Sequence, residues 1–151
     1  MRLTLHTDYA LRMLIQISLA GDRRVTIREV ADAYGISRNH LMKVASQLQH
    51  LGYLETVRGK GGGLRLSLPA EDIRLGQLVR DLEPDFQIAE CFSPDNACVI
   101  TPHCRLKGIL NNALAAFLDV LDGFSLADLG QPAGRAAELR SLLQIRQQNP
   151  A

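Results

Sequence analysis

The chain is poor in several residue types and signals that would assign it to a particular class. It has no tryptophan, only 5% aromatic residues, and just three cysteines in 151 residues. No apolar run reaches the length that a membrane span needs. The start, MRLTLHTDYALRML, has a charge inside its apolar stretch and no small-residue cleavage site, so we expect no signal peptide. With 46% hydrophobic residues the chain can still bury a core, which predicts one cytoplasmic domain, or one compact unit with an appendage.

Signatures of catalysis are missing as well. The sequence shows no nucleophile–base pair and no phosphate-binding loop. The stretch GKGGG at residues 59–63 lacks the strand–loop–helix context and the Ser or Thr of a Walker motif. We therefore predict that the protein is not an enzyme.

Charge is scarce overall but unevenly placed along the chain. The net charge is +1, yet residues 1–68 hold ten Lys/Arg against five Asp/Glu, and residues 69–151 hold seven against eleven. The difference is +5 for the first part and −4 for the second. A basic first half predicts an anionic partner, although ordinary surface scatter is the alternative and charge alone does not exclude it.

The most informative stretch is VTIREVADAYGISRNHLMKVASQLQHLGYLETVRGKGGGLRLSL, residues 25–68. Thr26 and Glu29 have the spacing of a capping box, Gly35 suits a tight turn, and Ser37 is expected to cap the following helix. Residues 54–57 and 64–68 read as two strands around a glycine-rich, basic hairpin tip. This order of elements, a helix, a short turn, a second helix and a basic hairpin, is typical of a winged helix-turn-helix. The alternative is a small α+β domain that does not bind DNA.

Helical periodicity predicts three further elements. A first helix over residues 7–20 has Thr7 as its expected N-cap. Residues 71–83 form another expected helix before Pro84, and a loop over residues 85–103 follows. A long helix over about 104–122 carries a wide apolar stripe, formed by Leu106, Ile109, Leu110, Ala113, Leu114, Phe117, Leu118 and Leu121. A stripe this wide predicts packing against a second copy in a two-fold dimer, although part of it also folds back on its own domain.

We therefore expect a mainly α protein in three parts. Residues 1–70 form a winged helix-turn-helix DNA-binding domain that includes the first helix. Residues 71–130 hold the cysteine loop (about 85–104) and the dimerisation helix (about 104–122). Residues 131–151 are a C-terminal helix or flexible tail, to which the sequence assigns no role.

The DNA-contacting residues follow from this layout. A recognition helix places its N-terminal side chains against base edges, and here these are Ser37, Arg38, Asn39, His40 and Lys43. Arg38 has the fork that reads guanine, and Asn39 has an amide that reads adenine. The cations of the hairpin, and two residues at the start of the preceding helix, are expected to contact phosphates: Arg58, Lys60, Arg65, Thr26 and Arg28. Each one taken singly is compatible with a solvated surface residue, and together they favour double-stranded DNA as the partner.

All three cysteines lie in CFSPDNACVITPHC, residues 91–104, with six and then five residues between them. Four interpretations are open: buried structural thiols, a redox switch, an iron–sulfur cluster, or a zinc site with three Cys and one His. For the zinc site His103 is adjacent to Cys104 and hence poorly placed, whereas His6 and His40 remain possible. The Ser, Pro, Asp and Asn of the loop argue against a buried apolar setting.

Together these motifs resemble the winged-helix iron–sulfur transcription regulators that include IscR and NsrR. The resemblance covers residues 1 to about 125 and rests on MRLTLHTDYALR, on residues 26–66, and on the three cysteines just ahead of the long helix. It implies a homodimer that binds a palindromic operator, and whose cluster state sets the affinity for DNA. No membrane partner is implied.

Within that family the residues are most similar to the branch of the nitric-oxide-sensing repressor NsrR. IscR-like members use a His three residues after the last cysteine, and here that residue is Lys107. NsrR-like members use an Asp of the first helix from the partner subunit, which Asp8 matches. The resemblance thus implies a cluster held by Cys91, Cys98, Cys104 and Asp8, with 4Fe-4S as first choice and 2Fe-2S as second. The spacing of six residues, where relatives often have five, is a departure.

Three alternatives accompany this expectation, one for Asp8 and two for the function. Asp8 also suits a simple first-turn charge, paired with Arg12 four residues later. For the whole protein, the expected function is a repressor that releases DNA when nitric oxide nitrosylates or removes the cluster. A regulator of the same family that senses iron–sulfur status, iron or redox is the first alternative, and a zinc-stabilised interaction module is the second.

Overall fold

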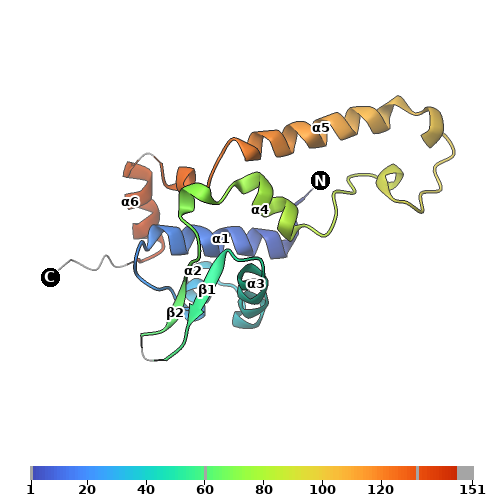
Figure 1. The fold of residues 1–151 in the computed structure, drawn as a ribbon. Helices are drawn as coiled ribbons and strands as arrows, with labels where there is room; N and C mark the ends of the chain where they lie inside the picture. The colour runs from blue at the N-terminus through green and yellow to red at the C-terminus, as the bar shows by residue number, and fades with distance from the viewer. Residues whose placement is uncertain (1, 60, 132, 146–151) are drawn as a thin grey trace.

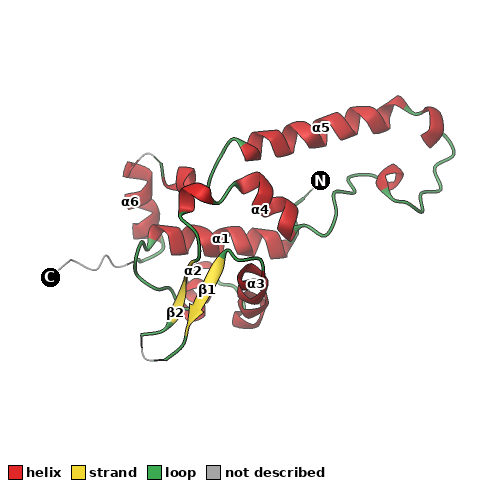
Figure 2. Cartoon of the chain, in the orientation of Figure 1, coloured by secondary structure: helices red, strands yellow, loops and turns green. Residues whose placement is uncertain are grey.

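The computed structural model describes residues 2–59, 61–131 and 133–145 (Figure 1). Helices dominate, and one two-stranded antiparallel sheet is present among the described residues (Figure 2). The elements in chain order are α1 (Leu5–Leu19), α2 (Ile27–Tyr34), α3 (Arg38–His50), β1 (Leu54–Val57), β2 (Gly63–Leu66), α4 (Leu75–Leu82), α5 (Arg105–Asp122) and α6 (Ala133–Leu142). The expected mainly α winged helix-turn-helix is confirmed.

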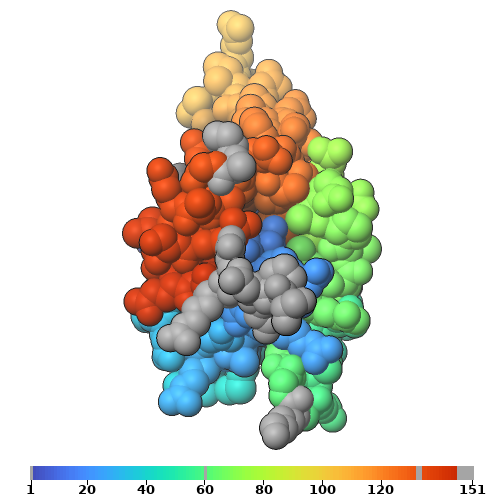
Figure 3. All heavy atoms as spheres, turned by 90° about the vertical axis from the view of Figure 1, so that its left-hand side faces the viewer, coloured from blue at the N-terminus to red at the C-terminus, as the bar shows by residue number. Residues whose placement is uncertain are grey.

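Three layers make up the molecule. Helix α1 lies in the middle, α2, α3 and the hairpin lie on one side of it, and α4 and α5 lie on the other (Figure 1). In the side view of Figure 3, α5 lies at the top of the molecule and the hairpin at the bottom. Helix α5 and the loop before it extend well beyond the body. No helix among the described residues has both the length and the apolar character to span a bilayer.

Helix α1 begins earlier than the sequence predicts. Thr4, not Thr7, is the N-cap: its Oγ1 accepts a hydrogen bond from the backbone N–H of Thr7 at 3.2 Å. Thr7 is itself fully buried in the first turn. Both threonines have a side chain that suits an N-cap. Thr7 is buried in the core, and Thr4, which is not fully buried, is the residue used. The apolar face of α1 enters the main core through Ala10, Met13, Leu14 and Ile17.

The helix-turn-helix forms as its caps predict, with two differences. The capping box joins Thr26 and Glu29 in both directions, at 3.2 and 2.6 Å. Burial alone would raise the pKa of Glu29, but hydrogen bonds from Thr26 and the Arg23 guanidinium bring it below its ordinary value. Ser37 occupies the N-cap position of α3 but makes no side-chain capping bond, which corrects that expectation. Leu51, expected inside, is 36% exposed because it lies after the last turn of α3.

The hairpin is joined to the helical pair at its base. Strands β1 and β2 pair from Leu54↔Leu66 to Val57↔Gly63, so the second strand begins and ends earlier than expected. Val25 and Leu64 exchange two backbone hydrogen bonds, at 3.0 and 2.7 Å. Val25, the residue before the N-cap of α2, thereby pairs with the outer side of β2 and fixes the direction in which the hairpin leaves the body.

Helix α4 is shorter than predicted and connects the layers. It begins at Leu75, after a short 3-10 turn at Ala70–Asp72, and ends before Glu83. The Arg80 guanidinium binds the Asp122 carboxylate of α5 through two hydrogen bonds, at 2.6 and 2.7 Å. The Tyr53 hydroxyl donates to Asp81 and joins α4 to the start of the wing. The five expected core positions of this segment are all buried: Ile73, Leu75, Leu78, Val79 and Leu82.

The last two helices differ in how they are covered. No residue of α5 is buried, and Leu106 and Ile109 are 57% and 61% exposed. Helix α6 packs on the end of α1, where Arg140 Nε donates to the Leu19 carbonyl at 2.9 Å. The expected weak helix after residue 131 therefore forms over Ala133–Leu142, and residues 146–151 lie outside the described part of the chain.

Gly35 offers a test of the turn between α2 and α3. Its φ is 65°, and a Cβ added there would meet no atom within 4 Å, so the cost of a side chain is purely conformational. We expect Gly35→Ala to lower the free energy of unfolding of the apo protein by roughly 1–2 kcal/mol. Urea unfolding measures this loss. Gly35→Asn is the control and should lose less, because asparagine tolerates the left-handed region; equal losses would contradict this account.

Candidate DNA interface and cysteine loop

The N-terminal half of α3 presents its polar side chains to solvent. All five candidates, Ser37, Arg38, Asn39, His40 and Lys43, are exposed. An open groove runs along the same face and is lined by Asn39, Met42, Lys43, Ser46, Gln47 and His50. Four of these lining residues, Met42, Ser46, Gln47 and His50, were missed by the sequence reasoning. Helical spacing from Asn39 and Lys43 would have found them.

The candidate cations differ in whether a carboxylate already binds them. Arg65 pairs with Glu55 across the hairpin at 2.8 Å, and Asp32 lies 3.8 Å from Arg38 and 3.9 Å from Arg28. Lys43 and Arg58 have no acidic partner within 4 Å among the residues that the structure describes. Lys60 lies outside the described residues. Charges without a partner carry the larger electrostatic attraction for phosphate, because no existing ion pair has to be exchanged.

His40 joins the recognition helix to α1. Its ring stacks on Tyr9, with centroids 6.4 Å apart and planes 28° from parallel. A cleft of about 180 Å³ between α1 and α3 is lined by Leu5, His6, Tyr9, His40, Lys43 and Val44. The position of α3 therefore depends directly on the first two turns of α1, where Asp8 also lies.

The structure pairs Asp8 with Arg12. The carboxylate lies 2.8 Å from Arg12 Nη2 and accepts a second bond from Nε at 3.1 Å. Arg12 also lies over the Tyr34 ring, 5.8 Å from its centroid. The side chain of Asp8 keeps 38% of its surface exposed, so the carboxylate remains accessible from outside the chain. The first-turn ion pair that the sequence offered as an alternative is thus formed in the single chain.

The cysteines lie in a loop with little regular structure. Two short 3-10 turns, Glu90–Phe92 and Thr101–His103, interrupt it, and Cys104 is the residue just before α5. All three thiols are free and half-buried. Among the described residues, no three His, Cys, Asp or Glu side chains lie close enough to hold a metal ion. The single chain does not gather Cys91, Cys98, Cys104 and Asp8 into one set.

The donor chemistry of the loop nevertheless suits an iron–sulfur cluster. Thiolates are the ligands that such clusters prefer, and three of them occur here without a disulfide between them. Near neighbours in the sequence supply the hydrogen bonds of this loop: the bond from Ala97 N–H to Glu90, at 3.1 Å, spans only seven positions. Its thiols can therefore turn toward a common centre without breaking an α-helix or a strand.

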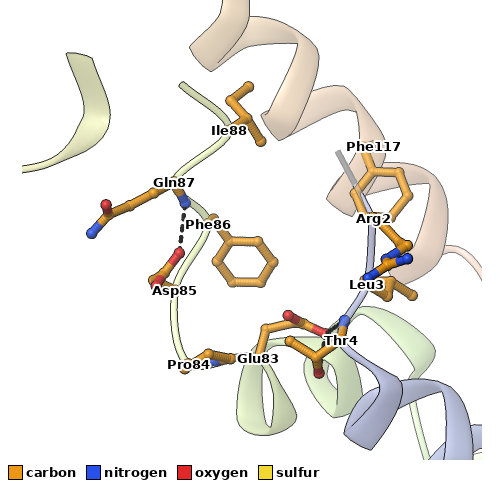
Figure 4. A pocket seen from close by; sticks show the side chains of 10 residues that line it. All are labelled: Arg2, Leu3, Thr4, Glu83, Pro84, Asp85, Phe86, Gln87, Ile88 and Phe117. Atoms are coloured by element: carbon orange, nitrogen blue, oxygen red, sulfur yellow. Dashed lines mark hydrogen bonds between the residues drawn. The ribbon is translucent and has the colours of Figure 1, made fainter. Parts of the chain in front are cut away.

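A pocket ties the start of the loop to the start of α1. It has a volume of about 250 Å³ and lies between the N-terminal residues, the segment after α4 and Phe117 of α5 (Figure 4). The backbone N–H of Thr4 donates to Glu83 Oε1 at 2.9 Å, and the Thr4 hydroxyl donates to the same oxygen at 3.1 Å. The start of α1, whose first turn carries Asp8, therefore lies beside the start of the segment that leads to Cys91. No sequence pattern predicts this contact, which spans 79 positions.

Comparison with known proteins assigns the family. A family model described as "Rrf2: Iron-dependent Transcriptional regulator" matches residues 3–132. The chain belongs to the Rrf2 family. The transcriptional regulator NsrR of Bacillus subtilis strain 168 is 51% identical over 131 residues, which cover 85% of this chain and 90% of that protein. NsrR of Shouchella clausii strain KSM-K16 is 42% identical over 148 residues, or 97% of each chain.

Solved structures agree with the fold of this Rrf2 protein. The oxidised form of Staphylococcus aureus CymR matches with a TM-score of 0.70 and 26% identity, over 87% of this chain and 97% of that one. The structure titled "T. potens IscR" matches with a TM-score of 0.71 over 88% of each chain, and at 22% identity it shows the fold alone. The Rrf2 protein is a DNA-binding transcriptional regulator of the NsrR type, and the expectation that it is not an enzyme is confirmed by its regulator relatives.

The ion pairs predict an order among the cationic side chains of the DNA surface. Arg58→Ala and Lys43→Ala should each weaken binding to a mixed-sequence duplex and lower the slope of log affinity against log salt by about 0.9, the value for one phosphate contact. Arg65→Ala should have a smaller effect, because Glu55 already neutralises that guanidinium. Fluorescence anisotropy at several salt concentrations measures both quantities. An effect of Arg65→Ala that equals that of Arg58→Ala would contradict the order.

Proposed function

We propose that the protein is a homodimeric repressor that holds an iron–sulfur cluster, releases its operator when nitric oxide reaches that cluster, and works in the cytoplasm. The observation that carries this proposal is three free thiols in one loop of a chain that is 51% identical to an NsrR. The loop starts beside the helix whose first turn carries Asp8. The candidate cluster ligands and the candidate DNA-contacting residues of α3 are thus connected through α1.

The dimer part of the proposal rests on α5. Its apolar stripe is only partly covered by the described residues of its own chain, since Leu106 and Ile109 stay more than half exposed, and its outer end extends beyond the body (Figure 1). A partly exposed stripe of this length is unfavourable in water and suits an isologous contact with a second copy. Two α3 helices held in this way would meet successive major grooves of a palindromic operator, one helical turn of about 34–36 Å apart.

The cluster part rests on the donor set. Cys91, Cys98 and Cys104 would hold three positions, and Asp8 of the partner subunit would hold the fourth. When bound, the cluster supplies an iron that nitric oxide can attack, and the carboxylate-bound iron is the weakest point because oxygen is a hard ligand. To reach it, Asp8 must exchange Arg12 for the partner's loop. Asp8 then ties the first turn of α1, and through the Tyr9–His40 stack the recognition helix, to the other protomer.

Release of Asp8 would return it to Arg12 and free α1 from the partner loop. The spacing of the two recognition helices would then no longer be held, and affinity for the operator would fall. A small coupling is enough, since about 1.4 kcal/mol changes an affinity tenfold. A family member that senses iron–sulfur status, iron or redox would use the same residues with a different signal, and a zinc-stabilised module would use the thiols alone.

The cluster can be tested through its ligands. We expect anaerobically purified protein to be coloured and to contain iron and acid-labile sulfide, and Ala variants of Cys91, Cys98 or Cys104 to lose both. Asp8→Ala should alter the absorption spectrum and speed cluster loss, whereas Asp22→Ala, an equal change of charge at an exposed turn, should not. Asp8 has two proposed roles, pairing with Arg12 and binding the cluster. Arg12→Ala separates them, because it removes the ion pair and leaves the Asp8 carboxylate free to bind the cluster.

Several results would contradict the cluster proposal. Colourless, iron-free protein would exclude it, and zinc without sulfide would favour the interaction module. Loss of DNA binding on titration with nitric oxide in a Cys→Ala variant would show that the thiols are not the sensor. An unchanged spectrum and cluster lifetime in Asp8→Ala would leave Asp8 only its pairing with Arg12.

The dimer can be tested on α5. We expect Ile109→Asp, which places a charge in the apolar stripe, to convert the protein to a monomer at micromolar concentration. Light scattering coupled to gel filtration measures the mass. Asn112→Asp introduces the same side chain off the stripe and should leave the dimer intact. A wild-type monomer, or a dimer that survives Ile109→Asp, would count against the proposed interface.

A further inference from the structure

Arg24 lies in the turn between α1 and α2 and reaches across to the wing. Its side chain is exposed, and its Nη1 donates a hydrogen bond to the carbonyl of Gly61 at 3.0 Å, 37 positions along the chain. Gly61 lies in the hairpin tip, so one guanidinium spans from the base of the helix-turn-helix to the end of the wing. Neither the sequence pattern nor the expected set of DNA contacts included this residue.

The backbone beside Arg24 packs closely against the same hairpin. A Cβ added to Gly63 would lie 3.1 Å from the Cβ of Arg24 and 3.0 Å from the carbonyl oxygen of Val25. Val25 in turn exchanges two backbone hydrogen bonds with Leu64. The glycine at this position therefore permits the close approach, and the approach brings the tip within reach of Arg24.

The charge of Arg24 is not neutralised within the chain. Its neighbour Arg23 points to Glu29, with Nη1 and the carboxylate 2.6 Å apart. Arg24 has no carboxylate within 4 Å among the residues that the structure describes. A guanidinium has five N–H donors, and the Gly61 carbonyl occupies a single bond. The remaining donors and the full positive charge face solvent beside the tip of the wing.

We propose that Arg24 is a further DNA-contacting residue, which holds the wing tip through Gly61 and donates its free N–H groups to a backbone phosphate. A planar guanidinium suits this double role, because its fork can bind a carbonyl on one side and a phosphate on the other. Arg24 would fix the angle of the wing at the moment when the wing meets the DNA. The inference rests on the DNA binding of the protein, and on no property of the cluster.

Binding of a mixed-sequence duplex several helical turns long tests the contact. We expect Arg24→Ala to weaken binding roughly tenfold and to lower the salt slope by about 0.9. Arg24→Lys should keep the slope, because the charge remains, but recover only part of the affinity, because an ammonium lacks the fork. Arg135→Ala removes an equal charge from the exposed surface of α6 and serves as the matched control.

Hydrogen exchange in the free protein tests the hold on the wing separately. Backbone amides of residues 58, 59 and 61–63 should exchange faster in Arg24→Ala and at the wild-type rate in Arg135→Ala, while the unfolding midpoint stays unchanged. A loss of affinity no larger than that of Arg135→Ala would overturn the proposal. So would weaker binding with an unchanged salt slope, which would leave Arg24 without a phosphate contact. A wild-type protein that binds no duplex would instead refute DNA binding itself.

Discussion

Burial of α1 between two layers is the interaction on which the rest of the structure depends. Met13 and Leu14 are fully inaccessible to solvent and Ile17 is nearly so. One side of the helix supports α3 and the wing, and the other supports α4. A fully buried aliphatic side chain of this size contributes about 1.5–3 kcal/mol, so this helix has little freedom to tilt without loss of stability. A displacement of its first turn would therefore also move α3, the candidate recognition helix.

The polar contacts around α4 extend that rigidity to the segment that leads to the cysteines. Arg80 fixes α5, Asp81 receives the Tyr53 hydroxyl, and Glu83 caps the start of the chain at Thr4. Burial, together with the Asp81 carboxylate, raises the pKa of Tyr53, so its hydroxyl stays protonated and continues to donate. Each contact joins segments that are distant in sequence. Together they orient the beginning of the loop, while the rest of the loop extends outside the packed body (Figure 1).

The loop and α5 contrast with this body because they are only partly covered. A helix with no buried residue and a loop with three free thiols are both incomplete in a single chain. The proposed dimer would complete both at once. The second copy would cover the exposed apolar side chains of α5, and Asp8 of one protomer would meet the cysteines of the other. In the single chain Arg12 binds Asp8, so that carboxylate would have a defined partner before it met the cysteines. A sensor built in this way needs two discrete partners for a single side chain, and the structure supplies the first of them.

The sequence by itself determined the elements whose signals are local. The capping box of Thr26 and Glu29, the left-handed Gly35 and the period of Leu41, Val44 and Leu48 act within a few residues, and all three features appear as expected. The candidate recognition residues followed from the same local logic. Only the tertiary structure decided between Thr4 and Thr7 as the cap, because burial chose between two equally suited side chains. It also placed Arg24 on Gly61 and Glu83 on Thr4. Such contacts depend on how layers pack, and packing sums many weak interactions that no short stretch of sequence contains.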